Sequence, residues 1–473
     1  MLKTKNLQFV PVTIILLLLP FISSAQTGVE VSKALGEVGD GFSMSSLLRG
    51  LLGMAVLIGI CYLFSSNRRQ ISWRVVIFGL IFQLALALAV LKVPAIQHII
   101  EFIAKVFIKI LDSSNAGSEF LFKSLVTNKV ELGLINFAFQ ILPTIIFFSA
   151  LTSVLFYYGI IQKVVYGMAW LLTKVLRISG AEGLVASSNV FLGQTEAPFL
   201  IKEYLPKMNR SEIMLVMVAG MATMAGGVLA IYIGLLGGDD PVGKMLFAKH
   251  LITASVMAAP AAVVTSKILV PQTEPIESDI KITKDKIGDN ILDAIANGTG
   301  SGLKLAVNVA AMLIAFIALI FFINFILGKI GDWTHLNASV SAITGGTYEK
   351  FSLQFMLGYS LAPLTWLMGV NAHDMTLVGQ LLGEKIILNE MIGYASLKEM
   401  LTAGVFYDQK SIILAVYVLC GFANFSSVGI QIGGIGAIAP NQRKTLSSLG
   451  FRALLGGGMT ALISATLVAM ILG

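Results

Sequence analysis

Two carboxylates lie within otherwise apolar stretches of the sequence, and each belongs to a segment interrupted by small or helix-breaking residues. Glu196 lies in segment 193–198, which reads Gly-Gln-Thr-Glu-Ala-Pro, and Glu390 directly follows Asn389. A carboxylate in apolar surroundings is costly unless hydrogen-bond donors surround it. An ionised carboxylate only accepts hydrogen bonds, so each of these two could bind a hydroxyl or a ring N–H group of a ligand.

Amide, hydroxyl and apolar side chains accompany both carboxylates. Segment 220–227 follows the first carboxylate and segment 421–427 follows the second, and both segments are rich in small residues. Amides both donate and accept hydrogen bonds, and neighbouring apolar side chains could form the walls for a flat ring. This inventory suits a sugar joined to a planar base better than an amino acid, which would need fixed countercharges. The predicted ligand-binding residues are Gln194, Thr195, Glu196, Val228, Glu390, Phe422, Asn424 and Ser427. The competing interpretation is that these groups only cap broken helices and join loop tips.

The composition defines the surroundings of these residues. Of the 473 residues, 56% are apolar and 12% are charged, whereas a soluble domain carries about 25% charged residues. The mean hydropathy is +0.85. These values exclude a soluble globular enzyme, a disordered regulator and a nucleic-acid binder, and they leave an integral membrane protein with several spans. The net charge of +7 is explained by Lys and Arg in cytoplasmic loops.

The first 25 residues resemble a processing signal. Lys3 and Lys5 precede a short apolar run at 12–19, and small residues lead to Ala25. This pattern is typical of a secretory signal peptide, with an uncleaved first span as the alternative. Cleavage after Ala25 would leave the mature N-terminus outside the cytoplasm.

The apolar runs predict an all-α membrane protein with about eight transmembrane helices, at roughly 20 residues per crossing. Segment 94–111 is too polar to cross and is predicted to be an amphipathic helix in the membrane interface. Arg68 and Arg69 follow the first mature span and are expected in the cytoplasm, which places both termini outside. The predicted spans are 47–64, 75–91, 137–157, 213–236, 246–269, 303–327, 412–435 and 449–472.

Two further stretches, 181–205 and 351–397, are predicted to be re-entrant hairpins. Basic residues flank the first stretch on both sides, so it must enter and leave on the cytoplasmic side, while the second enters from outside. The halves therefore have inverted topology, an arrangement typical of secondary transporters that bind substrate between broken helices at the midplane. The expected division is a signal at 1–25, scaffold helices at 26–158, a first transport half at 159–270, a loop and scaffold helix at 271–350, and a second transport half at 351–473.

The order and spacing of these segments resemble the concentrative nucleoside transporter family over most of the mature chain. The segments that carry the resemblance are 137–143, 145–151, 194–198, 220–226, 389–390 and 421–427. The resemblance implies a secondary active importer of nucleosides in the inner (plasma) membrane. It also implies coupling to sodium or protons, alternating access and a homotrimer in which each protomer has its own path.

The resemblance also implies residue roles. Gln194, Thr195 and Glu196 would contact the nucleobase, with Val228 and Phe422 as apolar base contacts, and Glu390, Asn424 and Ser427 would hold the ribose hydroxyls. A sodium ion would bind the Asn189 side chain, the Leu192 carbonyl, the Thr223 hydroxyl and the Met224 carbonyl. A hard cation prefers such oxygens, so sodium coupling is favoured over proton coupling. No cofactor besides the coupling ion is expected.

Two departures from the family pattern concern the second hairpin. Segment 391–394 reads Met-Ile-Gly-Tyr, and segment 369–374 reads Gly-Val-Asn-Ala-His-Asp. Both bear on the shape of the external gate and on base preference. The remaining alternatives are a membrane-embedded enzyme that uses Glu196 and Glu390 as acid and base, and a passive channel.

Overall fold

The computed structural model describes residues 43–127, 142–238, 240–276, 288–346 and 348–473, and these form helices without a strand. The predicted signal at 1–25 lies outside the described residues. The first helices are α3 (Met44–Leu63), α4 (Trp73–Lys92), α5 (Pro94–Thr127), α7 (Leu142–Tyr157), α8 (Ile160–Leu176), α9 (Gly180–Ser188), α10 (Arg210–Ala222), α11 (Gly226–Gly237) and α12 (Pro241–Leu269). The others are α13 (Ile291–Trp333), α14 (Leu336–Ile343), α15 (Leu353–Leu367), α16 (Met375–Ile387), α17 (Glu390–Ala403), α18 (Gln409–Leu419), α19 (Phe425–Ile438) and α20 (Arg443–Leu472).

Several helices are long and apolar enough to cross a membrane, which agrees with the predicted multi-pass class. Among the described residues these number five, or six if the pair α7 and α8, bent by 76°, is one span. The count of eight stays a prediction. It is larger partly because the apolar run 412–435 is divided into α18 and α19, which are too short to qualify separately.

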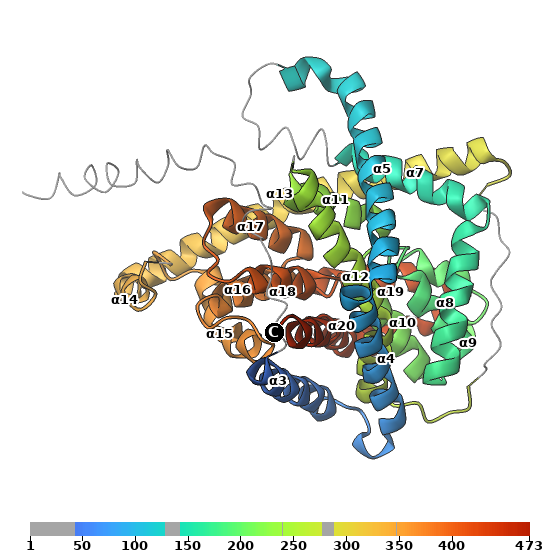
Figure 1. Ribbon diagram of the computed structural model, residues 1–473, viewed down its shortest axis with the longest axis horizontal. Helices are drawn as coiled ribbons and strands as arrows, with labels where there is room; N and C mark the ends of the chain where they lie inside the picture. Colours follow the sequence, from blue (N-terminus) through green and yellow to red (C-terminus); the bar gives the residue numbers. More distant parts are fainter. Residues whose placement is uncertain (1–42, 128–141, 239, 277–287, 347) are drawn as a thin grey trace, which may run out of the picture.

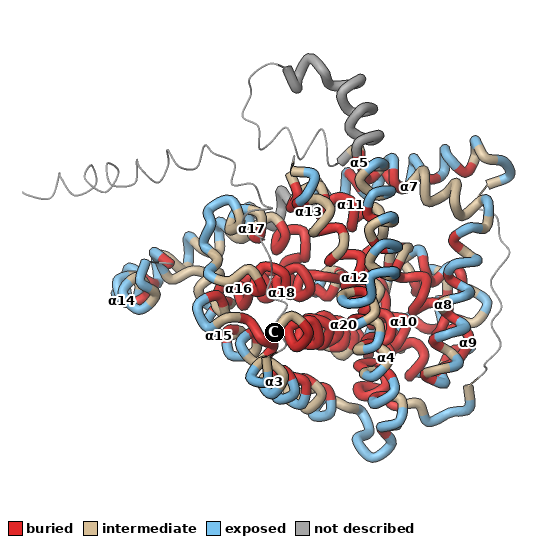
Figure 2. Tube along the Cα trace, in the orientation of Figure 1, coloured by how far each residue is buried: buried red, intermediate tan, exposed pale blue. Residues whose placement is uncertain are grey.

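The core of the molecule lies around α10, α12 and α20, which occupy its centre in Figure 1. In the most apolar stretch of α12 or α20, 94% of the residues are buried within the chain, against 28% for α3 or α4. Figure 2 shows the same contrast between a buried centre and an exposed periphery. Apolar side chains that the chain itself does not cover must be covered by lipid or by another protein.

The first hairpin begins with α9 and returns through the short 3₁₀ helices Ala197–Ile201 and Leu205–Lys207. Ser179 and Glu182 form a capping box at the start of α9. The buried Glu182 also forms an ion pair with Lys267 of α12, whose Nζ donates to Ser211 Oγ of α10 at 3.0 Å. The hairpin is therefore fixed to the central helices at its base.

The second hairpin is shorter than predicted. Stretch 351–397 begins with α15, which continues as a helix through Pro363, and only α16 and α17 form the hairpin. Asn389 caps α17 by accepting a hydrogen bond from the Ile392 N–H at 3.0 Å, so Asn389 and Glu390 lie at the hairpin tip. A proline inside a helix removes only one backbone donor, which explains why α15 survives.

The amphipathic helix is longer than predicted, because α5 runs to Thr127 rather than ending at 111. Glu101 of α5 accepts a hydrogen bond from Lys249 of α12 at 2.5 Å. This bond and the lysine charge lower the pKa of the Glu101 carboxyl. The contact joins α5 to the central helices.

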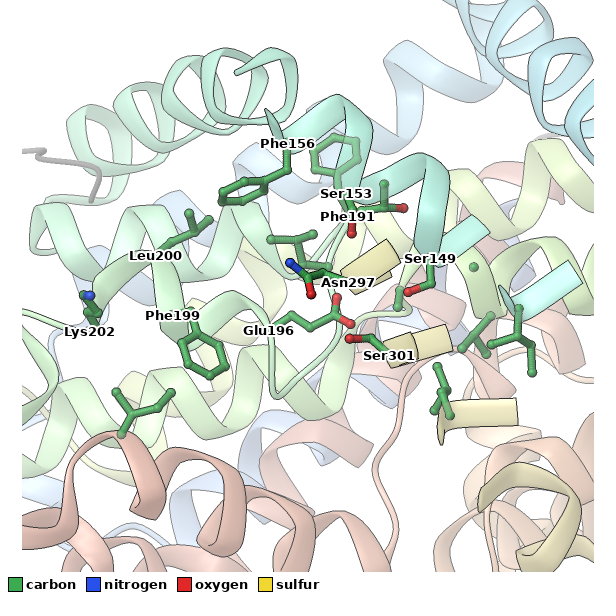
Figure 3. Close-up of a pocket in the computed structure, with 18 of the residues that line it drawn as sticks. Ser149, Ser153, Phe156, Phe191, Glu196, Phe199, Leu200, Lys202, Asn297 and Ser301 are labelled. Carbon is green, nitrogen blue, oxygen red and sulfur yellow. The ribbon is translucent and has the colours of Figure 1, made fainter. Parts of the chain in front are cut away.

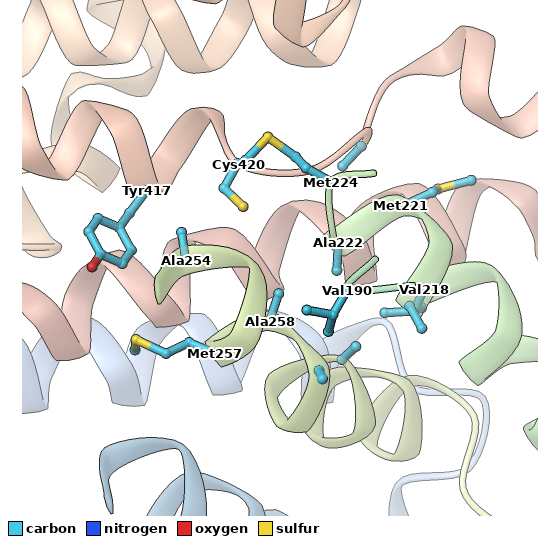
Figure 4. Packing of buried hydrophobic residues seen from close by; sticks show 14 of the residues in the cluster. Val190, Val218, Met221, Ala222, Met224, Ala254, Met257, Ala258, Tyr417 and Cys420 are labelled. Carbon is cyan, nitrogen blue, oxygen red and sulfur yellow. The ribbon is translucent and has the colours of Figure 1, made fainter. Parts of the chain in front are cut away.

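Each of the two predicted spans with small residues is broken into two helices. The first break, residues 223–225, separates α10 from α11, and the second, residues 420–424, separates α18 from α19. Gly421 has φ +87°, and a Cβ there would lie 2.5 Å from the Ala222 carbonyl oxygen. The two breaks therefore cross in direct backbone contact, and only glycine fits at the crossing. Figure 4 shows Met224 of the first break and Cys420 of the second break among the buried apolar side chains there.

Candidate functional site

A chain of hydrogen bonds joins the two hairpin tips to the second break. Gln194 Nε2 of the first tip donates to Ser427 Oγ at 3.1 Å, and the Ser427 N–H donates to Asn424 Oδ1 at 2.9 Å. Asn424 Nδ2 donates in turn to Glu390 Oε2 of the second tip at 3.0 Å. These four side chains are buried. Residues 233 positions apart in the sequence thus form one polar cluster inside an apolar protein.

Glu390 receives a second donor from the first half of the chain. The hydroxyl of Tyr232 on α11 donates to Glu390 Oε1 at 3.1 Å. The Tyr232 ring stacks on Tyr394, with centroids 4.0 Å apart, and the Tyr394 hydroxyl donates to the Val416 carbonyl at 3.1 Å. A carboxylate accepts about four hydrogen bonds in all, so Glu390 keeps the capacity to accept one from a ligand as well.

Gln194 is held from a second side. Gln431 of α19 donates through Nε2 to Gln194 Oε1 at 3.1 Å and to the Met217 carbonyl at 3.0 Å. Gln194 also lies so close to Gly220 that a Cβ there would be 3.0 Å from the Gln194 Cβ. The orientation of this amide is therefore set by packing as well as by hydrogen bonds.

A cavity of about 630 Å³ opens beside the first tip, between the hairpin and helices α7 and α13. Its lining includes Glu196 and Val228 together with the polar side chains of Ser149, Asn297 and Ser301. Figure 3 shows the Glu196 carboxylate directed toward the α13 residues. Glu196 also accepts a hydrogen bond from the Gly193 N–H at 3.2 Å, which closes the tip turn. A cavity of this size accommodates a drug-sized molecule.

The two remaining predicted ligand-binding residues, Thr195 and Phe422, are not among the residues that line this cavity. Thr195 contacts α19, because a Cβ at Gly434 would be 3.0 Å from the Thr195 methyl group. Phe422 is a half-buried residue of the second break and packs against the apolar core.

The four predicted sodium ligands belong to the first tip and the first break, two segments that touch each other. The Gly226 N–H donates to the Phe191 carbonyl at 3.1 Å, which joins the two segments. Asn189 ends α9, its Nδ2 donates to the Val185 carbonyl at 2.8 Å, and its buried Oδ1 has no hydrogen-bond partner. Thr223 is the C-cap residue of α10, and Thr223, Leu192 and Met224 are all buried. A buried acceptor without a donor fits a cation.

No cluster of three or more His, Cys, Asp or Glu that could hold a metal occurs within the described ranges. The predicted sodium ligands are neutral oxygens and are not of this kind.

Three residues of this region were missed by the sequence analysis. Tyr232 and Gln431 each lie four positions after a predicted site residue, namely Val228 and Ser427. Residues four apart share a helix face, so this spacing was the available signal. The third, Lys385 of α16, donates to the Cys420 carbonyl of the second break at 2.6 Å and carried no such signal.

Two hairpin tips that meet two crossing broken helices inside a multi-pass bundle define a secondary transporter. The comparisons with known proteins agree with this class. The family models described as Na⁺ dependent nucleoside transporter, N-terminus and C-terminus, match residues 52–125 and 250–469, and a nucleoside recognition model matches residues 138–239.

Individual relatives extend over most of the chain. An uncharacterized transporter of Haemophilus influenzae is 38% identical and covers 90% of this chain and 98% of its own length. Sodium/nucleoside cotransporter 1 of Rattus norvegicus is 36% identical over 87% of this chain and 62% of its own longer sequence. The inward-facing, substrate-bound structure of CNTnw is 36% identical, with a TM-score of 0.81 over 90% of this chain and 99% of CNTnw.

The chain belongs to the concentrative nucleoside transporter family, as the resemblance predicted. Its members are transporters, so the alternative of a membrane-embedded enzyme is excluded. Structures of CNTnw have been solved in inward-facing, intermediate and outward-facing states, and the structure of this chain is similar to all three.

The hydrogen bond from Tyr232 to Glu390 can be tested by removing one oxygen. We expect Tyr232→Phe to raise the nucleoside concentration for half-maximal uptake by about three- to tenfold. A hydrogen bond to a charged group contributes about 1.5–3 kcal/mol, and water that replaces the tyrosine hydroxyl restores part of this energy. The measurement is uptake into vesicles at several nucleoside concentrations. Tyr166→Phe, on the exposed face of α8, is the control and should leave uptake unchanged. Equal values for the two variants would contradict a role of Tyr232.

Proposed function

We propose that this chain imports nucleosides across the inner (plasma) membrane and couples each import to sodium entry. The observation that carries the proposal is the hydrogen-bonded chain from Gln194 through Ser427 and Asn424 to Glu390. It joins both hairpin tips at one polar point inside an apolar bundle, which is where a transporter of inverted repeats binds its substrate.

The two ends of this hydrogen-bonded series of side chains suit the two parts of a nucleoside. Gln194, Thr195 and Glu196 would bind the edge of the base, since an amide and a carboxylate accept ring N–H groups and the amide also donates. Glu390, Asn424 and Ser427 would hold the ribose hydroxyls. Val228 and Phe422 would cover the faces of the base.

The scaffold for movement is proposed to include α7 and α13. A Cβ at Gly302 of α13 would lie 2.7 Å from the Ile146 Cα of α7, so these two helices are tightly packed. The cavity of about 630 Å³ separates this pair from the first hairpin and offers a route for the nucleoside. Sodium binding would order the first tip, the nucleoside would then bridge both hairpins, and the hairpin-bearing unit would move across the scaffold by alternating access.

Sodium is the proposed coupling ion because the first tip and the first break offer neutral oxygens. The unpartnered Oδ1 of Asn189 supports this choice, since a buried acceptor is satisfied by a bound cation. The similarity to a protein named sodium/nucleoside cotransporter supports it as well. Proton coupling in the same fold is the alternative.

The experiment that tests the function is uptake of a nucleoside panel by vesicles that contain the purified protein. We expect accumulation with an inward sodium gradient and little uptake when choline replaces sodium. Uptake that is indifferent to sodium but abolished by a protonophore would favour proton coupling. Absence of accumulation for every nucleoside under both gradients would refute the proposed function.

Asn189→Ala tests the sodium site. We expect the sodium concentration for half-maximal uptake to rise by about tenfold or more, because one of few oxygen ligands is removed. The nucleoside concentration for half-maximal uptake at saturating sodium should change much less. Asn67→Ala, on the exposed turn between α3 and α4, is the matched control. An unchanged sodium requirement in Asn189→Ala would place the coupling ion elsewhere.

Assembly and orientation complete the proposal. We propose a homotrimer with both termini outside the cytoplasm. The exposed aromatic side chains of α13, of which Phe321 is 77% exposed, and those of α3 and α4 need lipid or a second copy to cover them. Mass measurement in detergent and labelling of a cysteine added at the C-terminus would test these two statements.

A further inference from the structure

Lys385 of α16 is a charged side chain with no exposed surface. It is among the largest fully buried side chains of the described structure, and none of the steps proposed above uses it. Removing an ammonium group from water is costly unless the surroundings replace its hydrogen bonds and charge. A buried lysine therefore needs specific partners.

The partners of Lys385 are two backbone carbonyls at one place. Its Nζ donates to the Val418 oxygen at 2.9 Å and to the Cys420 oxygen at 2.6 Å. These carbonyls lie at the end of α18, where Cys420 is the C-cap residue. The last carbonyls of a helix lack intrahelical donors and carry the negative end of the helix dipole, so a cation satisfies both needs.

The location of this contact connects it to the nucleoside site. Cys420 opens the second break, which goes on through Gly421 to Asn424, while Lys385 precedes Glu390 by five residues on the second hairpin. The second hairpin thus contacts the second break at two points. Lys385 donates to the Cys420 carbonyl, and Glu390 accepts a hydrogen bond from Asn424. Moving the break would move the proposed ribose-binding groups.

The first half of the chain has the corresponding parts in the corresponding order. There α9 leads to the first tip, and α10 and α11 flank the first break, as α16 leads to the second tip and α18 and α19 flank the second break. In the first half, however, the polar side chain at the end of the hairpin helix α9 is neutral. It is Asn189, whose buried Oδ1 lacks a donor.

We propose that Lys385 is a covalently attached cation at the second break, with the role there that the coupling ion has at the first break. It is a positioning residue: it orients the ribose-binding groups and does not itself bind the nucleoside. This proposal rests on the sodium-coupled function proposed above. It implies that one half of the protein needs a mobile cation and the other does not, so one sodium ion enters with each nucleoside.

The experiment compares three variants in vesicles, with sodium activation curves and nucleoside saturation curves for each. Lys385→Met keeps all but the last atom of the side chain's length and removes its charge and donors. Lys385→Ala also leaves space beside the two carbonyls. Tyr394→Phe is the matched control, because it removes a neutral donor to the same helix, at the Val416 carbonyl, without changing charge.

We expect Lys385→Met to raise the nucleoside concentration for half-maximal uptake by about tenfold or more, and Tyr394→Phe to raise it by about threefold or less. In Lys385→Ala the sodium activation curve should steepen from a Hill coefficient near 1 toward about 2, because a second sodium ion replaces the ammonium group. A merely structural defect would lower the amount of active protein without steepening this curve. Thermal unfolding of the purified variants shows which of them remain folded.

The outcomes separate the proposals. If Lys385→Met and Tyr394→Phe behave alike, or if the Hill coefficient of Lys385→Ala stays near that of the unsubstituted protein, Lys385 is not the cation of the second half. If neither Lys385 variant folds, the ratio of sodium to nucleoside flux in the unsubstituted protein decides: one supports the proposal and two overturns it. If that protein takes up nucleosides without sodium, the proposed coupling fails, and Lys385 is judged by the nucleoside curves alone.

Discussion

Replacing Glu390 by glutamine is expected to lower nucleoside uptake at subsaturating concentration by about 100-fold. Glu390 accepts hydrogen bonds from the Tyr232 hydroxyl and from Asn424 Nδ2. A glutamine amide has only one accepting atom, so its NH₂ group would face one of these two donors. The variant also loses the charge that strengthens hydrogen bonds to ribose hydroxyls, each contributing about 1.5–3 kcal/mol. Two such losses correspond to about 100-fold or more.

The measurement is initial uptake of uridine and adenosine into vesicles. Glu399→Gln on the exposed face of the same helix, α17, is the control and should transport normally. A nucleoside analogue that lacks the 2′- and 3′-hydroxyls of the ribose should discriminate little between Glu390→Gln and the unsubstituted protein. Intact uptake of both nucleosides by Glu390→Gln would refute the assignment of Glu390 to the ribose.

Gly421→Ala is expected to abolish most transport because it distorts the backbone, not because it removes a contact with the ligand. The residue has φ +87°, where any residue with a Cβ is strained. The new Cβ would also lie 2.5 Å from the Ala222 oxygen and 2.7 Å from the Met221 oxygen. These atoms belong to the backbone of the first broken helix and can move away only if the two breaks separate. We expect a destabilisation of about 2 kcal/mol or more and uptake lower by about tenfold or more.

Thermal unfolding and uptake measured on the same preparation would check this expectation. Gly429→Ala is the matched control, because Gly429 lies in α19 with no atom near its Cβ position. That substitution should leave stability equal or raise it by about 0.5–1 kcal/mol through helix propensity. If Gly421→Ala has the same unfolding temperature and the same uptake as Gly429→Ala, the two breaks do not cross in close contact.

Local features of the sequence were enough to predict the hairpins and the breaks. Glycine, proline and small residues interrupt the helical pattern at 193–198 and 220–227, and the structure has a turn and a break there. The same signal misled the prediction at Pro363, because a proline alone does not reveal whether the helix continues around it. The number of helices could not be predicted from composition, because a run of apolar residues has the same composition whether it forms one continuous helix or two helices with a break between them.

The polar network could not be predicted in full because it depends on contacts between distant residues. Tyr232 and Glu390 are separated by 158 positions, and the crossing of Gly421 with Ala222 joins the two halves of the chain. Lys385 would have been expected in a loop or at the membrane surface, as most lysines are. Its burial makes sense only after the end of α18 is seen to offer two carbonyls beside it.

The amino-acid sequence was sufficient to show that this is a multi-pass membrane protein and that small residues interrupt its helices beside the polar residues, and it predicted inverted halves. Composition and local helix-breaking residues decide these properties, and both are local features of the sequence. Which donor faces which acceptor became visible only in the folded chain, because these hydrogen bonds join helices that are far apart in the sequence.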